Sequence, residues 1–144
     1  MTIIELSQLV KKDLGRINKD ELIFESARIP EMFNKYHELY TQCRLLKLDY
    51  EKKFNILEKV KWEYYSGKAD PEVYKAKPFN LKLHTQEGIK RYMETDEELT
   101  NLKERMKILQ EKEDFLKRVL SSIDQRQWNI RNINESMKFF HGNN

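Results

Sequence analysis

The chain has 144 residues, of which 35% are charged, and it contains only 4 glycines and 3 prolines. This composition is typical of long helices, and the length is that of about one domain. The formal net charge is only +3, so any nucleic-acid site must come from local clustering of cations. The single Cys43 excludes an internal disulfide, no apolar run approaches the ~20 residues of a membrane span, and no signal sequence begins the chain. We therefore expect a cytoplasmic protein.

Residues 1–29 are predicted to form short N-terminal helices. Apolar residues recur at helical spacing over residues 3–14, and Gly15 ends that segment. Asn18 is a suitable cap for a second helix. Pro30 must kink the helix or restart it, because proline has no N–H and its ring clashes with the preceding turn.

Residues 31–65 contain no glycine and only helix-compatible residues, with apolar and aromatic side chains at steps of three and four. This pattern predicts one long helix that ends before Gly67. Residues 66–95 are predicted to form an ordered connection with at most a short strand around Leu81–Leu83 and one short helix capped by Thr85.

Residues 96–140 are predicted to form the second long helix, with Thr95 and Glu98 as its capping box. Its apolar seam alternates three- and four-residue steps. The seam comprises Leu99, Leu102, Met106, Leu109, Glu113, Leu116, Leu120, Ile123, Gln127, Ile130, Asn134 and Met137. The predicted fold is all-α, in one domain over residues 1–144: a long helical hairpin of helices 31–65 and 96–140 with short N-terminal helices.

The two long helices carry more apolar residues than one two-helix seam can bury, so we expect a homo-oligomer. A basic and aromatic cluster near the C-terminus fits this role, with Arg126 pairing Asp124 and Arg131 pairing Glu135. The residues expected to serve oligomerisation are Trp128, Ile130, Ile133, Met137 and Phe140.

No signature of catalysis is apparent. The four glycines are too isolated for a phosphate-binding loop, and the three histidines lie far apart without the spacing of a zinc site. We therefore expect no enzymatic activity, no cofactor, no metal and no catalytic residue.

The segment Lys59–Lys68 carries three lysines and three aromatic residues within ten positions. Ammonium groups can contact phosphates and aromatic rings can stack on unpaired bases, so the segment predicts a site for single-stranded nucleic acid. Further lysines follow in the connection. The predicted DNA-binding residues are Lys59, Lys61, Trp62, Tyr64, Tyr65, Lys68, Lys75 and Lys77.

Two alternatives stay open for this segment. Tyr64 and Tyr65 can simply complete an apolar seam while the lysines are solvated. The whole chain can then be a coiled-coil scaffold or adaptor without nucleic-acid binding. Against this, Lys61 falls where the heptad favours an apolar residue, which predicts that the two helices separate at this end.

Two motifs resemble those of the UvsY-type recombination mediators of T4-like bacteriophages. One is Leu57–Lys68, with its Tyr64-Tyr65-Ser66-Gly67 sequence, and the other is Arg126–Ile133 followed by Lys138-Phe139. The similarity extends through the whole chain. It implies a small helical protein that forms a ring-like homo-oligomer in the host cell cytoplasm, with the C-terminal helix serving self-association.

The resemblance also implies the partners. Members of this family bind single-stranded DNA and help a RecA-like recombinase of the UvsX type displace single-strand-binding protein and nucleate its filament. This activity serves homologous recombination and recombination-dependent replication and repair. By position in the first motif, Lys59 and Lys61 would be the basic pair that contacts DNA.

Overall fold

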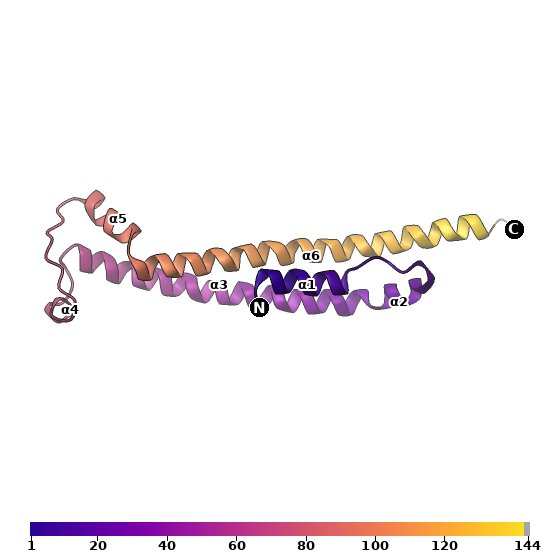
Figure 1. The fold of residues 1–144 in the computed structure, drawn as a ribbon, viewed down its shortest axis with the longest axis horizontal. Helices are drawn as coiled ribbons and strands as arrows, with labels where there is room; N and C mark the ends of the chain where they lie inside the picture. Colours follow the sequence, from indigo (N-terminus) through magenta and orange to yellow (C-terminus); the bar gives the residue numbers. More distant parts are fainter. Residues whose placement is uncertain (143–144) are drawn as a thin grey trace. The chain divides into compact units, whose positions relative to one another are not determined.

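The computed structural model describes residues 1–142, which form six α-helices, one 3₁₀ turn and no strand (Figure 1). The prediction of an all-α fold is confirmed. The chain divides into two compact units. We call Met1–Arg44 with Glu111–Asn144 the terminal unit, and Leu45–Gln110 the central unit. Among the described residues, no helix is long and apolar enough to cross a membrane.

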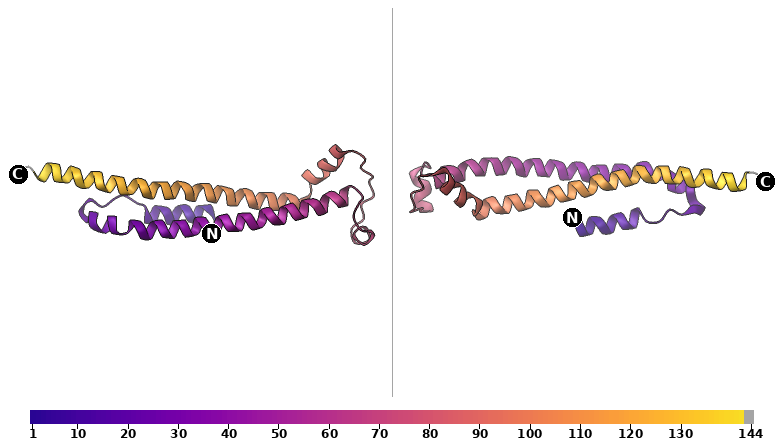
Figure 2. Two further views of the ribbon diagram at one scale, coloured as in Figure 1. Left: turned by 180° about the vertical axis from the view of Figure 1, so that it is seen from behind. Right: turned by 90° about the horizontal axis from the view of Figure 1, so that it is seen from above.

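The terminal unit contains α1 (Ile3–Asp13), the 3₁₀ turn η1 (Lys19–Glu21) and α2 (Leu22–Ala27), together with the first part of α3 (Ile29–Tyr65) and the last part of α6 (Glu97–His141). Within this unit, α1 runs alongside the paired segments of α3 and α6, as the views in Figures 1 and 2 agree. Helix α1 therefore covers part of the long helices here.

Two local signals set the starts of α1 and η1. Thr2 and Glu5 form a capping box, in which the Glu5 N–H donates to Thr2 Oγ1 at 3.2 Å and the Thr2 N–H donates to Glu5 Oε2 at 2.8 Å. Asn18 Oδ1 accepts from the Asp20 N–H at 3.0 Å, so Asn18 is a cap as predicted, but of the 3₁₀ turn η1 rather than of helix α2. The Thr2 box was not predicted.

Pro30 occupies the first turn of α3. Helix α2 ends at Ala27 and α3 begins at Ile29, so the predicted restart is confirmed. A proline is tolerated there because the first N–H groups of a helix have no partner within the helix.

The core of the terminal unit lies where α1, α3 and α6 meet. Tyr36 and Ile123 are both 0% exposed, and the Tyr36 hydroxyl donates to Asp13 Oδ2 at 2.8 Å. This bond satisfies the polar end of a buried ring. The other buried apolar residues of this unit are Leu6, Ile29, Met32, Cys43, Leu116, Val119 and Ile130.

Along α6 the predicted seam residues Leu116, Ile123 and Ile130 are buried, but between them Val119 and Arg126 are buried in place of Leu120 and Gln127. Arg126 is buried, whereas Gln127 is exposed. The predicted pairing of Arg126 with Asp124 is wrong, because Arg126 donates to Glu25 on α2 at 2.7 Å. Charges close in sequence do not meet here because Arg126 points into the unit.

In the central unit, the last part of α3 and the first part of α6 run side by side, as the predicted hairpin requires (Figures 1 and 2). Lys47 Nζ donates to Gln110 Oε1 at 2.7 Å, and Arg105 Nη1 donates to the Tyr50 hydroxyl at 3.0 Å. Polar side chains therefore link the two helices.

The connection between these helices contains α4 (Pro71–Ala76) and α5 (Gln86–Glu94). Helix α4 was not predicted, although Asp70-Pro71 is a favourable start with proline in the first turn. Residues 77–84 contain no strand. The predicted Thr85 cap is confirmed, since Thr85 Oγ1 accepts from the Gly88 N–H at 3.1 Å.

The cap of α6 differs from the prediction. Asp96, not Thr95, accepts the Leu99 N–H at 3.1 Å. Thr95 Oγ1 instead donates to the Arg91 carbonyl at 3.2 Å and so closes the last turn of α5. The two adjacent residues thus end one helix and begin the next.

Candidate nucleic-acid interface

Helix α3 ends in a left-handed glycine turn. Gly67 has φ of 79°, the Lys68 N–H donates to the Glu63 carbonyl at 2.9 Å, and the Gly67 N–H donates to the Tyr64 carbonyl at 3.3 Å. These two bonds are those of a Schellman motif, in which glycine avoids the strain of a positive φ. The turn reverses the chain and brings Lys68 back toward α3.

Lys68 returns over the ring of Trp62. Its Nζ lies 4.8 Å from the ring centroid, within the range of a cation–π interaction. Trp62 is 39% exposed, and Lys59 lies one turn before it on the same side of α3 and is exposed. Two exposed lysines and a partly exposed aromatic ring, all among the predicted residues, therefore lie near the end of α3.

Tyr64 and Tyr65 are packed differently from Trp62. Both are half-buried, and their rings lie among three rings from the connection and α5, with neighbouring centroids 5.1–5.8 Å apart. We call this the aromatic cluster. It consists of Tyr64, Tyr65, Tyr74, Phe79 and Tyr92.

Hydrogen bonds fix the aromatic cluster to the backbone. The Tyr74 hydroxyl donates to the Tyr64 carbonyl at 2.8 Å, and the Tyr64 hydroxyl donates to the Lys77 carbonyl at 3.1 Å. The two tyrosines of the Tyr-Tyr-Ser-Gly sequence thus hold the connection against the end of α3. Sequence reasoning missed Tyr92 as their neighbour.

A pocket of about 400 Å³ opens beside the aromatic cluster. Its walls include Tyr65, Tyr74 and Phe79, and Lys82 and His84 bring polar groups to it. The pocket therefore combines ring surface with a cationic side chain.

Lys61 lies in a network of carboxylates. Its Nζ is 3.2 Å from Asp96 Oδ2 and 3.2 Å from Glu98 Oε1, and its side chain is 14% exposed. Asp96 Oδ2 also accepts from the Tyr65 hydroxyl at 2.5 Å. The lysine predicted to interrupt the seam is thus held within the central unit by charges from the start of α6.

The environment of this network changes the pKa of three groups. Burial would raise the pKa of Asp96, but bonds from Tyr65, the Leu99 N–H and Lys61 hold it below its ordinary value. Burial and the Asp96 carboxylate raise the pKa of Tyr65. Burial would lower the pKa of Lys61, yet Asp96 and Glu98 raise it above its usual range. Near neutral pH, Asp96 is therefore negatively charged, Lys61 positively charged and Tyr65 neutral.

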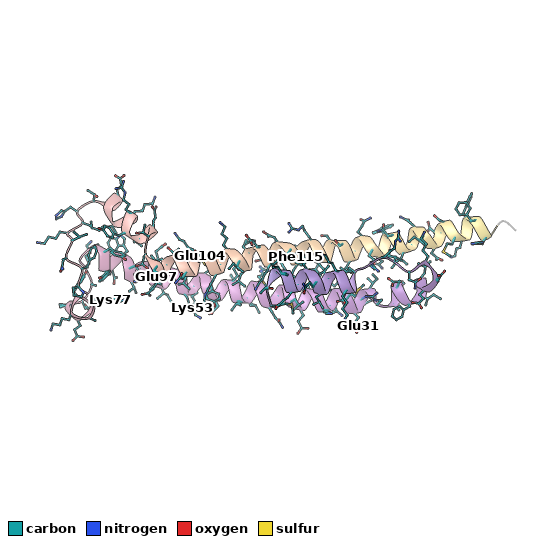
Figure 3. The ribbon with its side chains drawn as sticks, viewed as in Figure 1. Glu31, Lys53, Lys77, Glu97, Glu104 and Phe115 are labelled. Atoms are coloured by element: carbon teal, nitrogen blue, oxygen red, sulfur yellow. The ribbon has the colours of Figure 1, made fainter. Side chains whose placement is uncertain are left out.

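The predicted lysines of the connection remain in solvent. Lys75 and Lys77 are exposed, as are Lys82, Lys90 and Arg91. Lys77 Nζ reaches Glu98 Oε1 at 3.8 Å. Figure 3 labels Lys77 in the connection and Glu97 at the first turn of α6. The central unit therefore presents cations from α3, the connection and α5.

The residues predicted to serve oligomerisation differ in exposure. Ile130 is buried within the terminal unit, whereas Trp128, Met137 and Phe140 are exposed. Ile133 is half-buried and lines a groove with Ile17. Arg131 Cζ lies 5.1 Å from the centroid of the Trp128 ring. The end of α6 thus exposes three large apolar side chains of this group.

Residues 1–142 contain no cluster of three or more His, Cys, Asp or Glu side chains arranged to hold a metal ion. The functional groups gathered in the central unit are cations, carboxylates and rings. Such groups can bind a polyanion and its bases.

The chain shares its fold with solved structures of one protein. Crystal structures of the bacteriophage T4 recombination mediator protein UvsY in lattice types II, I and IV match with TM-scores of 0.86, 0.83 and 0.82. The identities are 21%, 21% and 20%. The alignments cover 96%, 94% and 96% of this chain and 97%, 98% and 98% of the other. No curated protein sequence matches significantly.

A family model described as "Recombination, repair and ssDNA binding protein UvsY" matches residues 10–143. This match includes both motifs on which the resemblance was based. It also includes the end of α3, the aromatic cluster and all of α6. The chain therefore belongs to the UvsY family of recombination, repair and single-stranded DNA-binding proteins.

Proposed function

We propose that this chain binds the backbone of single-stranded DNA through a cationic face consisting of Lys59, Trp62, Lys68, Lys75 and Lys77. The observation that carries the proposal is the placement of Lys68 over the exposed Trp62 ring, one turn from Lys59. Ammonium groups there meet phosphates, and the ring offers a surface on which a base stacks without sequence preference.

Tyr64 and Tyr65 have a supporting role in this proposal. Their rings contact one another and the connection, so they hold Lys75 and Lys77 near the end of α3. The Lys61 ammonium is paired with the carboxylates of Asp96 and Glu98 in the protein without DNA. The predicted site is thus divided between groups that contact the strand and groups that position them.

The biological role that follows is that of a recombination mediator. A homo-oligomer repeats the cationic face, so several weak contacts along one strand act together and raise the overall affinity. A strand held in this way loosens the bound single-strand-binding protein, and a RecA-like recombinase nucleates on it. This chain needs to perform no catalytic step in that process. Membership of a single-stranded DNA-binding family favours this role over that of a scaffold.

Fluorescence anisotropy with a labelled oligonucleotide, measured over a range of salt concentrations, tests the DNA-binding proposal. We expect saturable binding that weakens as the salt concentration rises. The double variant Lys59→Ala with Lys68→Ala should lower the affinity about tenfold or more and make the dependence of log affinity on log salt concentration less steep. Lys11→Ala with Lys12→Ala is the matched control, because it removes two exposed lysines of α1. Equal effects of the two double variants would contradict the proposed face.

Lys61 is a poor choice for this experiment. Its removal leaves the Asp96 carboxylate, which is 5% exposed, without an ion-pair partner, and so perturbs the fold together with the site.

The mediator role is tested separately by the DNA-dependent ATP hydrolysis of a RecA-like recombinase on DNA coated with single-strand-binding protein. We expect this chain to shorten the lag before the recombinase reaches its steady rate of ATP hydrolysis. If it binds no DNA and leaves the lag unchanged, the scaffold alternative holds.

A further inference from the structure

One carboxylate oxygen of the central unit lies between two ammonium groups. Glu98 Oε1 is 3.2 Å from Lys61 Nζ and 3.8 Å from Lys77 Nζ. Lys61 comes from α3 and Lys77 follows α4, so two separate elements converge on a single anionic oxygen. A phosphate oxygen of a DNA backbone seeks the same arrangement of cations.

The two carboxylates near Lys61 are held very differently. Asp96 is buried, caps α6 and accepts from Tyr65, Leu99 and Lys61, so its position is fixed by several bonds. Glu98 is 54% exposed, and within the described residues its ion pairs are those with Lys61 and Lys77. The Lys77–Glu98 pair joins side chains that are 74% and 54% exposed, and an ion pair between exposed side chains contributes little to stability. Of the two carboxylates, Glu98 is therefore the one that can leave.

We propose that the Glu98 carboxylate occupies a phosphate site of the DNA interface and is displaced from it when a strand binds. This inference rests on the proposed function. In the protein without DNA, Lys61 and Lys77 are partly neutralised by Glu98. When the strand arrives, a backbone phosphate takes the place of the Glu98 carboxylate, while Asp96 keeps its own ion pair with the Lys61 ammonium.

The consequence is a strand that is held less tightly than the lysines alone would hold it. Glu98 competes with phosphate for the same two ammonium groups, so it lowers affinity by its own attraction to them. It also offers the lysines a partner when the strand departs. A protein that hands its strand to a recombinase needs such release, because a mediator that bound too tightly would block the filament.

The test compares Glu98→Gln with Glu97→Gln. Both residues lie in the first turn of α6 and are exposed, so both substitutions raise the net charge by one and remove the same favourable charge from the helix start. Glu97 takes part in no ion pair with Lys61 or Lys77. The pair of variants therefore separates the local competition from the general change in charge.

We expect Glu98→Gln to tighten binding of a labelled oligonucleotide at least threefold more than Glu97→Gln does. Glu98→Ala should behave as Glu98→Gln, which controls for any new hydrogen bond from the amide. Lys77→Ala should weaken binding more in the Glu98→Gln background than in the unaltered protein, because only there is Lys77 fully available. Circular dichroism confirms that each variant is folded.

The outcomes distinguish the inference from the proposed function. If the unaltered protein binds the oligonucleotide in a salt-sensitive way but Glu98→Gln equals Glu97→Gln, the competition is overturned and the proposed function stands. If the unaltered protein shows no salt-sensitive binding, the proposed function fails and the inference fails with it.

Discussion

Arg126 on α6 donates through Nη2 to Oε2 of Glu25 on α2 at 2.7 Å, and both side chains are less than a tenth exposed. The same guanidinium donates through Nη1 to the Gly15 carbonyl at 2.7 Å. Arg28 adds a bond from Nη2 to the Asp13 carbonyl at 2.6 Å. Arg126 therefore ties α6 to α2 and to the segment after α1, and Arg28 adds the end of α1 to these contacts within the terminal unit.

The first prediction concerns this buried pair. Arg126→Ala should lower the free energy of unfolding by about 3–5 kcal/mol, because it leaves the Glu25 carboxylate buried without its main partner. Chemical denaturation followed by circular dichroism, at one protein concentration, measures the change. Arg118→Ala is the control, since Arg118 is exposed on the same helix. Similar values for the two variants would show that the pair contributes little.

The second prediction concerns the turn after α3. Gly67→Ala should destabilise the protein by about 1–2 kcal/mol, because an L side chain at a φ of 79° brings its Cβ close to the following carbonyl oxygen. Gly15→Ala should have a smaller effect, since its Cβ would meet only the Lys11 carbonyl oxygen at 3.5 Å, an ordinary contact. Thermal unfolding of the two variants compares them. A Gly67→Ala variant as stable as Gly15→Ala would contradict the role of the left-handed turn.

Helix positions were largely predictable because they depend on local signals. Pro30 has to lie at a helix start, Gly67 has to follow a helix end, and the spacing of apolar residues set the long helices between them. The choice between Thr95 and Asp96 as the cap of α6 was not predictable in this way. Both residue types are good caps, and only the position of Tyr65 and Lys61 in the fold favours Asp96.

The features that the sequence did not predict depend on contacts between residues that are far apart in the sequence. Glu25 and Arg126 are 101 positions apart, and a chain rich in acidic residues offers many nearer partners. The basic and aromatic character of Lys59–Lys68 was visible in the sequence. Its division between the exposed Trp62 and the packed Tyr64 and Tyr65 depends on Tyr74, Phe79 and Tyr92, which lie in a connection and a short helix without a long periodic pattern.

The third prediction concerns pH. In the folded protein the pKa of Asp96 lies below its ordinary value of 3.8, so its carboxylate adds stability above about pH 4, and this is lost as the pH falls through the folded-state pKa. The pKa values of Tyr65 and Lys61 are raised above 10.0 and 10.5. The stability that Tyr65 and Lys61 contribute is fully present below these ordinary pKa values, and it is lost as the pH rises through the raised pKa values of the folded protein.

Asp96→Asn tests this dependence, because asparagine keeps the helix cap and removes the charge. It should lower the free energy of unfolding by about 1.5–3 kcal/mol near neutral pH, the value of bonds to a charged group. The difference from the unaltered protein should shrink below about pH 4 and above about pH 10. Asp49→Asn, at a 53% exposed side chain paired with Lys53, should change stability little at any pH. A difference for Asp96→Asn that is the same at pH 3 and pH 7 would contradict the charge-based explanation.

The fourth prediction concerns the proposed homo-oligomer and the end of α6. Trp128 and Phe140 are 58% and 74% exposed, and exposed rings of this size are the residues that dominate association energies. Trp128→Ala with Phe140→Ala should raise the dissociation constant of the assembly at least about tenfold, or 1.4 kcal/mol, while the helix content stays unchanged. Sedimentation velocity over a dilution series measures this.

The control for this experiment is Val73→Ala with Leu81→Ala, which removes two exposed apolar side chains of the central unit. It should leave the association unchanged, because the proposed contact lies on α6. DNA binding then separates the two properties. Each subunit of the Trp128 and Phe140 variant keeps its cationic face, so it should still bind a short oligonucleotide, whereas its affinity for a long strand should fall because the faces no longer act together. If the variant assembles like the unaltered protein, the end of α6 is not the contact between subunits.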